Sequence, residues 1–375
     1  MEYQICNRCI MDNKSDPNIT FGTSGNCNYC NEAIERMSYT YFPNEEGKSK
    51  LATLLSEIKA SGKGKKFDCL MGISGGLDSS YLAYLGVRWG LRILAVHIDD
   101  GFDAPVAVDN IRKLCNSAAI ELITVKPDSE QFNDLTRAYI LAGVPNIAIP
   151  QDNILFAYLY KYARKYKLKY FLSGSNFSLE SVLQTGNSHS AMDLVNLKDI
   201  HKKYGTLPIN KLIFLSENKR MIDRFLYGIK TVKPLNYIDY NKEVAIKELK
   251  EFCDFNYYEA KHLENTLTKV TQLYWLYHKF GVDKRKSHLS SLIVSGQMTR
   301  EAALNEMLHS VYDKDKMVKD IDFVLNKLQI SKDDFDGIIG EKGHQHTEYK
   351  ISKPFLLNFA RTFLFFNKLK NKLQS

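Results

Sequence analysis

Short apolar runs alternate with longer stretches of helical character through the first half of the chain. Four runs are too short for helices and are typical of buried strands; they span residues 67–73, 91–98, 121–125 and 170–172. Three segments between them carry apolar residues at helical spacing, at residues 81–89, 106–118 and 153–167. Such alternation predicts an α/β fold with a doubly wound parallel sheet, whose ligands bind at the carboxyl ends of the strands.

A glycine turn joins the first predicted strand to the first predicted helix. The turn reads Ser74-Gly75-Gly76-Leu77-Asp78-Ser79-Ser80. Glycines let the backbone approach a ligand closely, and the free N–H groups and dipole of a helix N-terminus favour phosphate. The hydroxyls of Ser74, Ser79 and Ser80 can add hydrogen bonds. The motif is neither a Walker A loop nor a dinucleotide fingerprint, so we expect a different phosphate loop, with a plain glycine turn as the alternative.

Four of the seven cysteines form two C-x-x-C pairs near the N-terminus: Cys6, Cys9, Cys27 and Cys30. Two such pairs provide the closed tetrahedral set of thiolates that a structural zinc ion prefers. An iron–sulfur cluster and a redox pair are the alternatives. All four positions are used as ligands, so the predicted zinc is structural. Cys69, Cys115 and Cys253 stand singly and are expected in the core, with a reactive thiol as the alternative.

The length and composition of the chain exclude several classes of protein. A chain of 375 residues with 44% hydrophobic and 25% charged residues is long enough for two domains, or one domain with appendages. This composition excludes a disordered, collagen-like or disulfide-stapled chain. We find no run of about 18 uncharged apolar residues, and the first residues lack the pattern of a signal peptide. We therefore expect a cytoplasmic protein.

The positive charge is concentrated at the C-terminus. The net charge is +8, and residues 353–375 contribute five basic residues and no acid, which leaves about +3 for the rest. A nucleic-acid-binding surface would be basic throughout, so no nucleic-acid partner is expected. The tail, residues 351–375, mixes basic residues with phenylalanine and leucine. We expect an amphipathic helix that docks on this protein or a partner, with peripheral membrane contact as the alternative.

The Ser-Gly-Gly-x-Asp-Ser turn resembles the pyrophosphate loop, or PP-loop, of the N-type ATP pyrophosphatases. Together with the paired cysteines and segments 233–244, 261–269 and 279–304, the chain resembles the N-acetyl sugar amidotransferases called WbpG-, WbuX- or PseA-like. This resemblance runs from about Cys6 to Leu304. It implies an α/β PP-loop sheet with an N-terminal zinc module and a helical C-terminal region.

The resemblance implies an ATP-dependent, AMP-forming amidotransferase of lipopolysaccharide O-antigen or nonulosonic-acid biosynthesis. ATP would adenylate the acetamido oxygen of a nucleotide-activated N-acetyl sugar, releasing pyrophosphate, and ammonia would then displace AMP to leave an acetamidino group. Residue 2 is Glu2, and we find no cysteine in a class I glutaminase elbow. A separate glutaminase subunit is therefore expected, and a cyclase-like channel subunit is the other partner that the resemblance suggests.

The resemblance also implies roles for residues of the first half, with ATP and Mg²⁺ as cofactors. The phosphates would lie on Ser74, Gly75, Gly76, Asp78, Ser79 and Ser80. Adenosine would lie against Gly72 and Ile73, the end of the second strand at His97 and Asp99, and the following turn with Gly174 and Ser175. Asp78 would be the catalytic carboxylate associated with magnesium or pyrophosphate, with an N-cap role as the alternative.

Further candidates for the reacting end lie in the second half. Lys269, Lys284 and Arg285 would neutralise phosphate charge, and Glu264 would take a proton from ammonia. The alternative is that Glu264 and Lys269 are surface helix charges and that residues 284–286 form a solvated basic face. His262 and His288 are expected in buried hydrogen-bond networks.

The expected organisation has four parts. Residues 1–45 form the four-cysteine zinc module, 46–240 the PP-loop domain, 241–350 a helical substrate or partner region, and 351–375 the basic amphipathic tail. Two rival functions stay open. A tRNA thiolase would need a basic RNA-binding face and a sulfur-carrying cysteine, and a scaffold would bind zinc and ATP without turnover.

Overall fold

The computed structural model describes residues 2–14, 16, 18–257 and 264–352. Five parallel strands form one sheet in the order β3-β2-β1-β4-β5. Their bounds are Cys69–Gly72 for β1, Ile93–Ile98 for β2, Glu121–Val125 for β3, Tyr170–Leu172 for β4 and Lys230–Val232 for β5. The chain adds strands first on one side of β1 and then on the other. This confirms the doubly wound sheet and places a topological switch point at the carboxyl end of β1.

Strand β5 was not anticipated from the hydrophobic pattern. Its three residues include Lys230 and Thr231, and its burial pattern is largely exposed. An edge strand of this kind pairs on one side only, to β4, with Thr231 opposite Phe171. Because one edge faces solvent, no continuous apolar run is required there.

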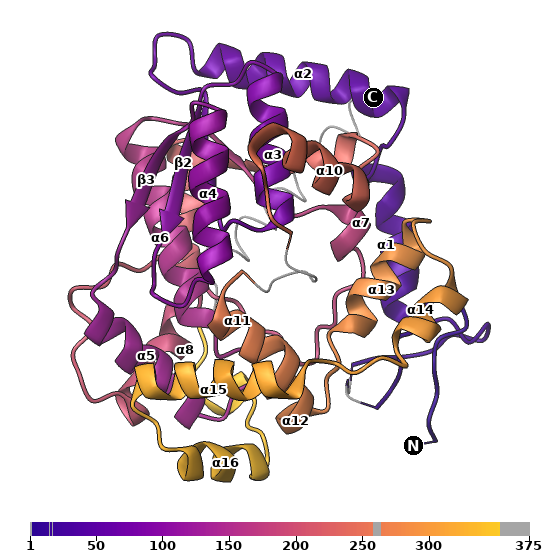
Figure 1. Ribbon diagram of the computed structural model, residues 1–375, viewed down its shortest axis with the longest axis vertical. Helices are drawn as coiled ribbons and strands as arrows, with labels where there is room; N and C mark the ends of the chain where they lie inside the picture. The colour runs from indigo at the N-terminus through magenta and orange to yellow at the C-terminus, as the bar shows by residue number, and fades with distance from the viewer. Residues whose placement is uncertain (1, 15, 17, 258–263, 353–375) are drawn as a thin grey trace, which may run out of the picture.

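Helices cover both faces of the sheet (Figure 1). One face carries α2 (Glu45–Ser61), α3 (Leu77–Arg88), α4 (Pro105–Ser117) and α10 (Lys242–Cys253), and the other carries α6 (Ile149–Lys165). Neighbouring residues of β1 point to opposite faces: Met71 packs in the cluster with α3 and α4, and Leu70 packs with α6. Burial on both faces explains why this strand reads as an unbroken apolar run.

A helical body forms the other half of the molecule and confirms the helical C-terminal region. It joins helices from both halves of the chain around one core: α5 (Ser129–Leu141), α8 (Leu194–Tyr204), α11 (Thr266–Val270), the π-helix η2 (Thr271–Trp275), α12 (Leu276–Phe280), α15 (Lys314–Leu328) and α16 (Lys332–Gly340). Trp275 is fully buried at its centre, and its indole N–H donates to the Val144 carbonyl at 2.9 Å. This contact fixes the rotation of η2, whose first residues face the site described below.

Several shorter elements complete the described chain. They are α1 (Asn28–Thr40), α7 (Phe177–Glu180), α9 (Glu217–Leu226), η1 (Pro234–Tyr237), α13 (Arg285–Val294), α14 (Arg300–Glu306) and η3 (His346–Glu348). No helix among the described residues is both long enough and apolar enough to cross a membrane. The tail predicted from residue 351 lies outside the described residues from position 353 onward, as does His262.

The four paired cysteines come together in a buried cluster. All four are fully buried, and their Sγ atoms lie within 4.8 Å of one another, with 3.6 Å between Cys6 and Cys30 and between Cys9 and Cys27. Four sulfurs bound at about 2.3 Å to one tetrahedral ion would be about 3.8 Å apart. A four-iron cluster binds each sulfur to a different iron and holds the sulfurs further apart. The geometry therefore fits a single ion such as zinc.

The cysteine module supports α13, which carries candidate site residues. The Arg300 guanidinium donates to the carbonyls of Cys9 and Cys6, each at 3.1 Å. The Ile10 N–H donates to Ser290 Oγ at 3.2 Å, and Ile10 packs against Leu289. In Figure 1, α1, α13 and α14 lie together on the side of the molecule away from the sheet. The module is thus a rigid base beneath the start of α13.

Replacing one cluster cysteine tests the metal. Cys9→Ser removes one of four ligands, so we expect loss of about one zinc per chain in elemental analysis and a fall in thermal midpoint of several degrees, because a structural ion contributes directly to folding. Cys115→Ser makes the same change at a buried cysteine outside the cluster and should keep its zinc. Wild-type protein without zinc, or with four irons per chain, would contradict the assignment.

Candidate functional site

The phosphate-loop candidate connects β1 to α3 at the switch point of the sheet. Gly75 has φ +75°, and a Cβ on it would lie 2.3 Å from the backbone oxygen of Ala107 in α4. Only glycine fits a left-handed conformation pressed against a neighbouring backbone. Gly76 is the N-cap residue of α3, and no side chain caps the first turn. The N-terminus of α3 therefore faces its surroundings with backbone donors, as an anion site requires.

Two of the three loop serines point toward the site. Ser74 Oγ lies 3.3 Å from Ser79 Oγ, and Ser74 donates to Glu264 Oε1 at 3.2 Å. The hydroxyl of Ser80, by contrast, is fully buried, has no hydrogen-bond partner among the described residues and lines neither of the two cavities described below. Neighbouring positions of α3 point in different directions, so the Ser79 hydroxyl can contact a ligand whereas the Ser80 hydroxyl packs in the core.

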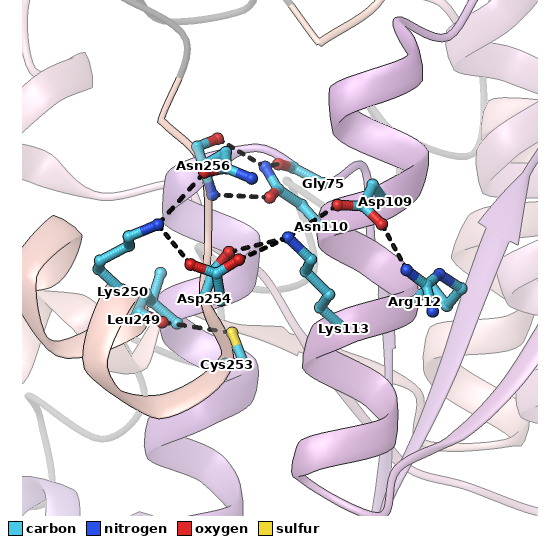
Figure 2. A network of polar contacts seen from close by, with 10 residues as sticks. All are labelled: Gly75, Asp109, Asn110, Arg112, Lys113, Leu249, Lys250, Cys253, Asp254 and Asn256. Carbon is cyan, nitrogen blue, oxygen red and sulfur yellow. Dashed lines mark hydrogen bonds and ion pairs between the residues drawn. The ribbon is translucent and has the colours of Figure 1, made fainter.

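Asn110 of α4 holds the loop from behind (Figure 2). Its side-chain NH₂ donates to the Gly75 carbonyl at 3.4 Å and to the Asn256 carbonyl at 2.9 Å, and its Oδ1 accepts from the Asn256 N–H at 2.9 Å. Lys113, one turn further along α4, pairs with Asp254 at 2.9 Å. The fully buried Asn110 thus ties the loop to the end of α10. Sequence reasoning missed it, because an asparagine within a helix carries no local signature of this role.

A cavity of about 820 Å³ opens at the carboxyl ends of β1, β2 and β4. The residues predicted to hold adenosine line it: Gly72, Ile73, His97, Gly174 and Ser175. Gly174 lies under the loop, since a Cβ there would be 3.0 Å from the Asp78 and Ser79 backbone. The structure therefore brings the predicted turn after β4 against the phosphate loop.

The two aspartates that follow β2 are not oriented as the sequence predicted. Asp99, expected in the crevice, instead pairs with Lys126 at 2.9 Å and lines neither cavity. Asp100 faces the cavity and accepts from Gln151 Nε2 at 2.5 Å and from Asn265 Nδ2 at 3.2 Å. Burial, together with the charge of Asp103, raises the pKa of Asp100 to about 6. Both residues lie beyond β2, which ends at Ile98, and the hydrogen bonds from Gln151 and Asn265 hold Asp100 at the cavity.

His97 is held between two partners at the floor of this cavity. Its Nδ1 lies 3.0 Å from the Ile73 carbonyl, and its Nε2 lies 3.3 Å from Asp103 Oδ2. Burial lowers the pKa of His97, but the hydrogen bond and charge of Asp103 and the Ile73 carbonyl outweigh burial, so the pKa is raised. The ring therefore stabilises the end of β1 where the loop begins.

A second cavity of about 370 Å³ lies on the other side of the loop. Four loop and first-turn residues line it, namely Gly76, Leu77, Asp78 and Ser79, together with Lys242, Arg285, His288 and Glu306. The two cavities share Ser74, Gly174, Ser175 and Glu264. The N-terminus of α3 thus faces the second cavity. Glu264 lies where the two cavities meet, and this junction is called the seam below.

Asp78 lies in the first turn of α3 rather than at the N-cap, which is Gly76. Its Oδ1 accepts a hydrogen bond from the hydroxyl of Tyr240. Burial raises the pKa of Tyr240, and the Asp78 charge raises it further. The phenol therefore stays protonated and keeps the carboxylate oriented at the edge of the second cavity.

The second-half candidates divide between the cavities. Lys284 lines the first cavity, and burial lowers its pKa although Glu180 opposes the shift. Arg285 lines the second cavity, and its Nη2 is held 2.7 Å from Asp283 Oδ2. Lys269 lines neither cavity and pairs with Asp320 at 2.5 Å. Four of the five predicted catalytic residues are thus brought to the loop, and Lys269 is not.

Asp152 is a buried carboxylate that sequence reasoning missed. It lies in the first turn of α6 and lines the first cavity. No partner for its carboxylate is found among the described residues, and burial raises its pKa to about 6. A lone acidic residue in the first turn of a helix gave no signal by itself, and only the placement of α6 against β1 and β2 turns it toward the site.

The loop geometry predicts that Gly75→Ala abolishes ATP binding. The added Cβ meets the Ala107 backbone oxygen, which cannot move without shifting α4, and the strained φ adds about 1 to 2 kcal/mol. Gly64→Ala is the matched control, because Gly64 has the same φ of +75° but open space around its Cβ position. Isothermal titration with an ATP analogue should show binding for Gly64→Ala only. Equal affinity in both variants would contradict this role of the loop.

The buried carboxylate predicts a pH-dependent gain in stability for Asp152→Asn. Its pKa is raised from 3.8 to about 6 in the folded protein, so the ionised carboxylate costs stability above pH 6 and nothing below about pH 4. In ligand-free protein the variant should be more stable by about 1 to 3 kcal/mol at pH 7.5, and the gain should shrink toward pH 4.5. Thermal melts across this range measure it, and a pH-independent effect would contradict the assignment.

One segment near the C-terminus matches a known family model. Residues 264–364 match the family model described as LPS biosynthesis protein WbpG-like, C-terminal domain. The match begins at Glu264, the residue at the seam of the two cavities. A tRNA-specific 2-thiouridylase, MnmA 2 of Fusobacterium nucleatum subsp. nucleatum, is 27% identical over 120 residues, which are 30% of this chain and 34% of that protein. The chain therefore covers about a third of the length of this curated relative.

Solved structures of similar fold include two nucleotide-related enzymes. One is the U34-tRNA thiolase NcsA from Methanococcus maripaludis with its [4Fe-4S] cluster, 16% identical, covering 82% of this chain and 90% of that chain with a TM-score of 0.33. The other is an NH₃-dependent NAD synthetase from Campylobacter jejuni, 14% identical, covering 80% and 98% with a TM-score of 0.33. Likenesses at this level carry no argument about function. In keeping with its sequence resemblance, the chain presents a turn similar to a PP-loop on a parallel sheet, and residues 264–364 are similar to a WbpG-like C-terminal domain.

Proposed function

We propose that this protein is an ATP-dependent, AMP-forming amidotransferase that converts the acetamido group of a nucleotide-activated sugar into an acetamidino group. The observation that carries the proposal is the seam at Glu264. There the PP-loop from the first half and the first residue of the WbpG-like domain meet, with Ser74 donating to Glu264 at 3.2 Å. A cavity that combines an ATP loop with walls from a lipopolysaccharide-biosynthesis domain suits the activation of a sugar.

The two cavities suggest how ATP lies. The pyrophosphate end fits the second cavity, where the N-terminus of α3 meets Lys242 and Arg285. Adenosine fits the first cavity, between the Gly72–Ile73 backbone and the apolar side of α6 at Phe156. The α-phosphate then lies at the seam. Cleavage between the α and β phosphates at this point would send pyrophosphate and AMP to different cavities.

Magnesium is the expected partner of the phosphates. Four carboxylates line the second cavity around the loop: Asp78, Glu180, Glu264 and Glu306. Carboxylate oxygens are the hard ligands that Mg²⁺ prefers, usually one or two of them together with phosphate oxygens. Asp78 is the best placed of them, because Tyr240 orients it in the first turn of α3. A bound magnesium ion would neutralise charge on the phosphates.

The proposed reaction has two steps, and each step forms one bond and breaks another. The acetamido oxygen attacks the α-phosphorus, an O–P bond forms, and the bond to the β-phosphate breaks to release pyrophosphate. Ammonia then attacks the imidate carbon, and the C–O bond breaks to release AMP, which keeps the former amide oxygen. Glu264 takes the proton that the attacking nitrogen loses. Lys284 stabilises the negative charge that builds up beside it.

Ammonia would come from a separate glutaminase subunit, with a cyclase-like channel subunit as a second partner. Both are proposals that follow from the WbpG-like resemblance. The cysteines of this chain support the need for an external source. All seven are buried among the described residues, and none lines either cavity, so none is placed as a glutaminase nucleophile at the site.

The same cysteine placement bears on the tRNA thiolase alternative. A thiolase that carries sulfur on a cysteine needs that thiol beside the activated substrate. Cys69, Cys115 and Cys253 instead pack in the core between the sheet and α3, α4 and α10. Burial raises the pKa of Cys115 to about 11, which suppresses its thiolate. The amidotransferase therefore fits the site better.

An isotope experiment tests the reaction. The protein is incubated with ATP, ammonium and a panel of nucleotide-linked acetamido sugars labelled with ¹⁸O in the acetamido group. We expect AMP and pyrophosphate by mass spectrometry, a sugar product lighter by about one mass unit than unlabelled substrate because NH replaces O, and ¹⁸O in AMP. Formation of ADP, or tRNA-stimulated AMP without any sugar product, would overturn the proposal.

Two adjacent serines give a matched pair for the loop. Ser79→Ala removes a hydroxyl that faces the site and should lower the rate about a hundredfold, the lower end for one transition-state donor. Ser80→Ala removes a buried hydroxyl that lines neither cavity and should keep most of the rate. Initial rates of AMP formation measure both. Equal losses in the two variants would contradict the assigned orientation of α3.

A further inference from the structure

We propose that the acetamido sugar binds in the arm of the first cavity between the start of α6 and the α11–η2 segment, and that Asp152 and Gln272 are its specificity-determining contacts. This acceptor arm is lined by Asn146, Gln151, Asp152, Thr268, Thr271 and Gln272. The inference rests on the function proposed above and names the place and the side chains that recognise the sugar.

The direction of attack points to this arm. In phosphoryl and adenylyl transfer the attacking and leaving oxygens lie roughly in line on opposite sides of phosphorus. Pyrophosphate leaves toward the second cavity, where the N-terminus of α3 lies. The acetamido oxygen must then approach from the first cavity, on the side of the seam away from Leu77 and Ser79. The acceptor arm is the polar part of the first cavity that the adenosine site does not use.

The arm has the chemistry of a carbohydrate site. Sugars present hydroxyl groups, and an acetamido sugar adds one N–H and one carbonyl, so recognition requires both donors and acceptors. The wall offers three side-chain amides, two threonine hydroxyls and one carboxylate. Two of these groups, the Asp152 carboxylate and the Gln272 amide, have no hydrogen-bond partner among the described residues and line the cavity at intermediate exposure. Their hydrogen-bonding capacity is therefore available to a ligand that enters the cavity.

The remaining wall residues form a rigid frame. Gln151 bridges the two sides: its Nε2 donates to Asp100 at 2.5 Å and its Oε1 accepts from Thr268 at 3.1 Å. Asn265, at the start of α11, also donates to Asp100 at 3.2 Å. The start of α6, the end of β2 and the start of α11 are thereby tied together. Asp152 and Gln272 project from elements that this frame holds in place, so their positions are set before a ligand arrives.

The π-helix gives Gln272 its direction. Segment Thr271–Trp275 is wound as η2 between α11 and α12, and such wide turns occur often at functional sites. Thr271 and Gln272 line the cavity, while Trp275 is buried on the other side and bonded to Val144. Gln272 also belongs to the WbpG-like segment. The WbpG-like segment therefore supplies one side of the acceptor arm, and the start of α6 supplies the other.

The cavity is large enough for two ligands. Small-molecule sites usually occupy about 300 to 1,000 Å³, and the first cavity measures about 820 Å³. Its residues form two groups, the adenosine side with Gly72 and Phe156 and the acceptor arm with Asn146 and Gln272. Room beyond the adenosine site is expected only if a second substrate binds beside it.

Binding measurements with two substitutions and one control test the proposal. Titrations use the full chain with α,β-methylene-ATP, which is not cleaved, and then the same panel of nucleotide-linked acetamido sugars. Gln272→Leu and Asp152→Asn should each weaken sugar binding at least tenfold and change the affinity for α,β-methylene-ATP less than twofold. Gln4→Leu makes the same change at an exposed position of the cysteine module and should leave both affinities unchanged.

The outcomes separate this proposal from the one it rests on. If no sugar of the panel binds to or reacts with the wild-type protein, the proposed function fails, and the acceptor arm with it. If the wild type binds a sugar but the two variants bind it equally well, the acceptor arm is wrong and the function stands. If the variants lose the ATP analogue as strongly as the sugar, the wall serves the nucleotide, and the assignment is overturned.

Discussion

The contact between Gly75 and the first turn of α4 fixes where the glycine turn lies, and the rest of the candidate site is arranged around this turn. A left-handed glycine pressed against the Ala107 carbonyl directs the chain from β1 straight into α3. Asn110 secures the same turn through the Gly75 carbonyl. Because the turn is held in this way, the N-terminus of α3 faces the second cavity rather than the first. The division of the site into two cavities follows from that direction.

The second half of the chain is positioned against this loop by two separate supports. The Trp275 anchor and the Gln151–Asp100–Asn265 frame hold α11 and η2 beside the first cavity. The cysteine module contacts α13 beside the second cavity through the Ile10 N–H, which donates to Ser290 Oγ, and it contacts α14 through the Arg300 guanidinium, which donates to the Cys6 and Cys9 carbonyls. The packing of the four-cysteine cluster therefore bears on where α13, and with it Arg285, lies relative to the loop.

Several buried charges at the site oppose stability and favour ligand binding. Asp100 and Asp152 have raised pKa values of about 6, and burial lowers the pKa of Lys284. A stable core would replace such groups with apolar ones, because isolated buried charge costs several kcal/mol. Their concentration around one cavity, rather than through the core, is typical of a site whose ligands complete the hydrogen bonding.

The local sequence was sufficient for the elements whose signals are short range. The PP-loop follows from glycines between a strand and a helix, the cysteine cluster from two C-x-x-C pairs, and the parallel sheet from apolar runs alternating with helices. Each is assembled from short local patterns that can be recognised one by one along the chain, so the elements can be predicted without tertiary information. The C-terminal resemblance likewise resides in one continuous segment, residues 264–364.

The tertiary structure alone decided which side chains reach the ligand. Asp100 rather than Asp99 faces the cavity because Gln151 and Asn265 hold Asp100 there while Lys126 pairs with Asp99. Ser79 rather than Ser80 lines a cavity because of the rotation of α3. Lys269 pairs with Asp320, and Asp152 enters the site, because of how α15 and α6 pack. Orientation of this kind arises from contacts between residues far apart in the chain. A pattern of neighbours determines that an element forms, whereas packing determines which of its faces meets the ligand.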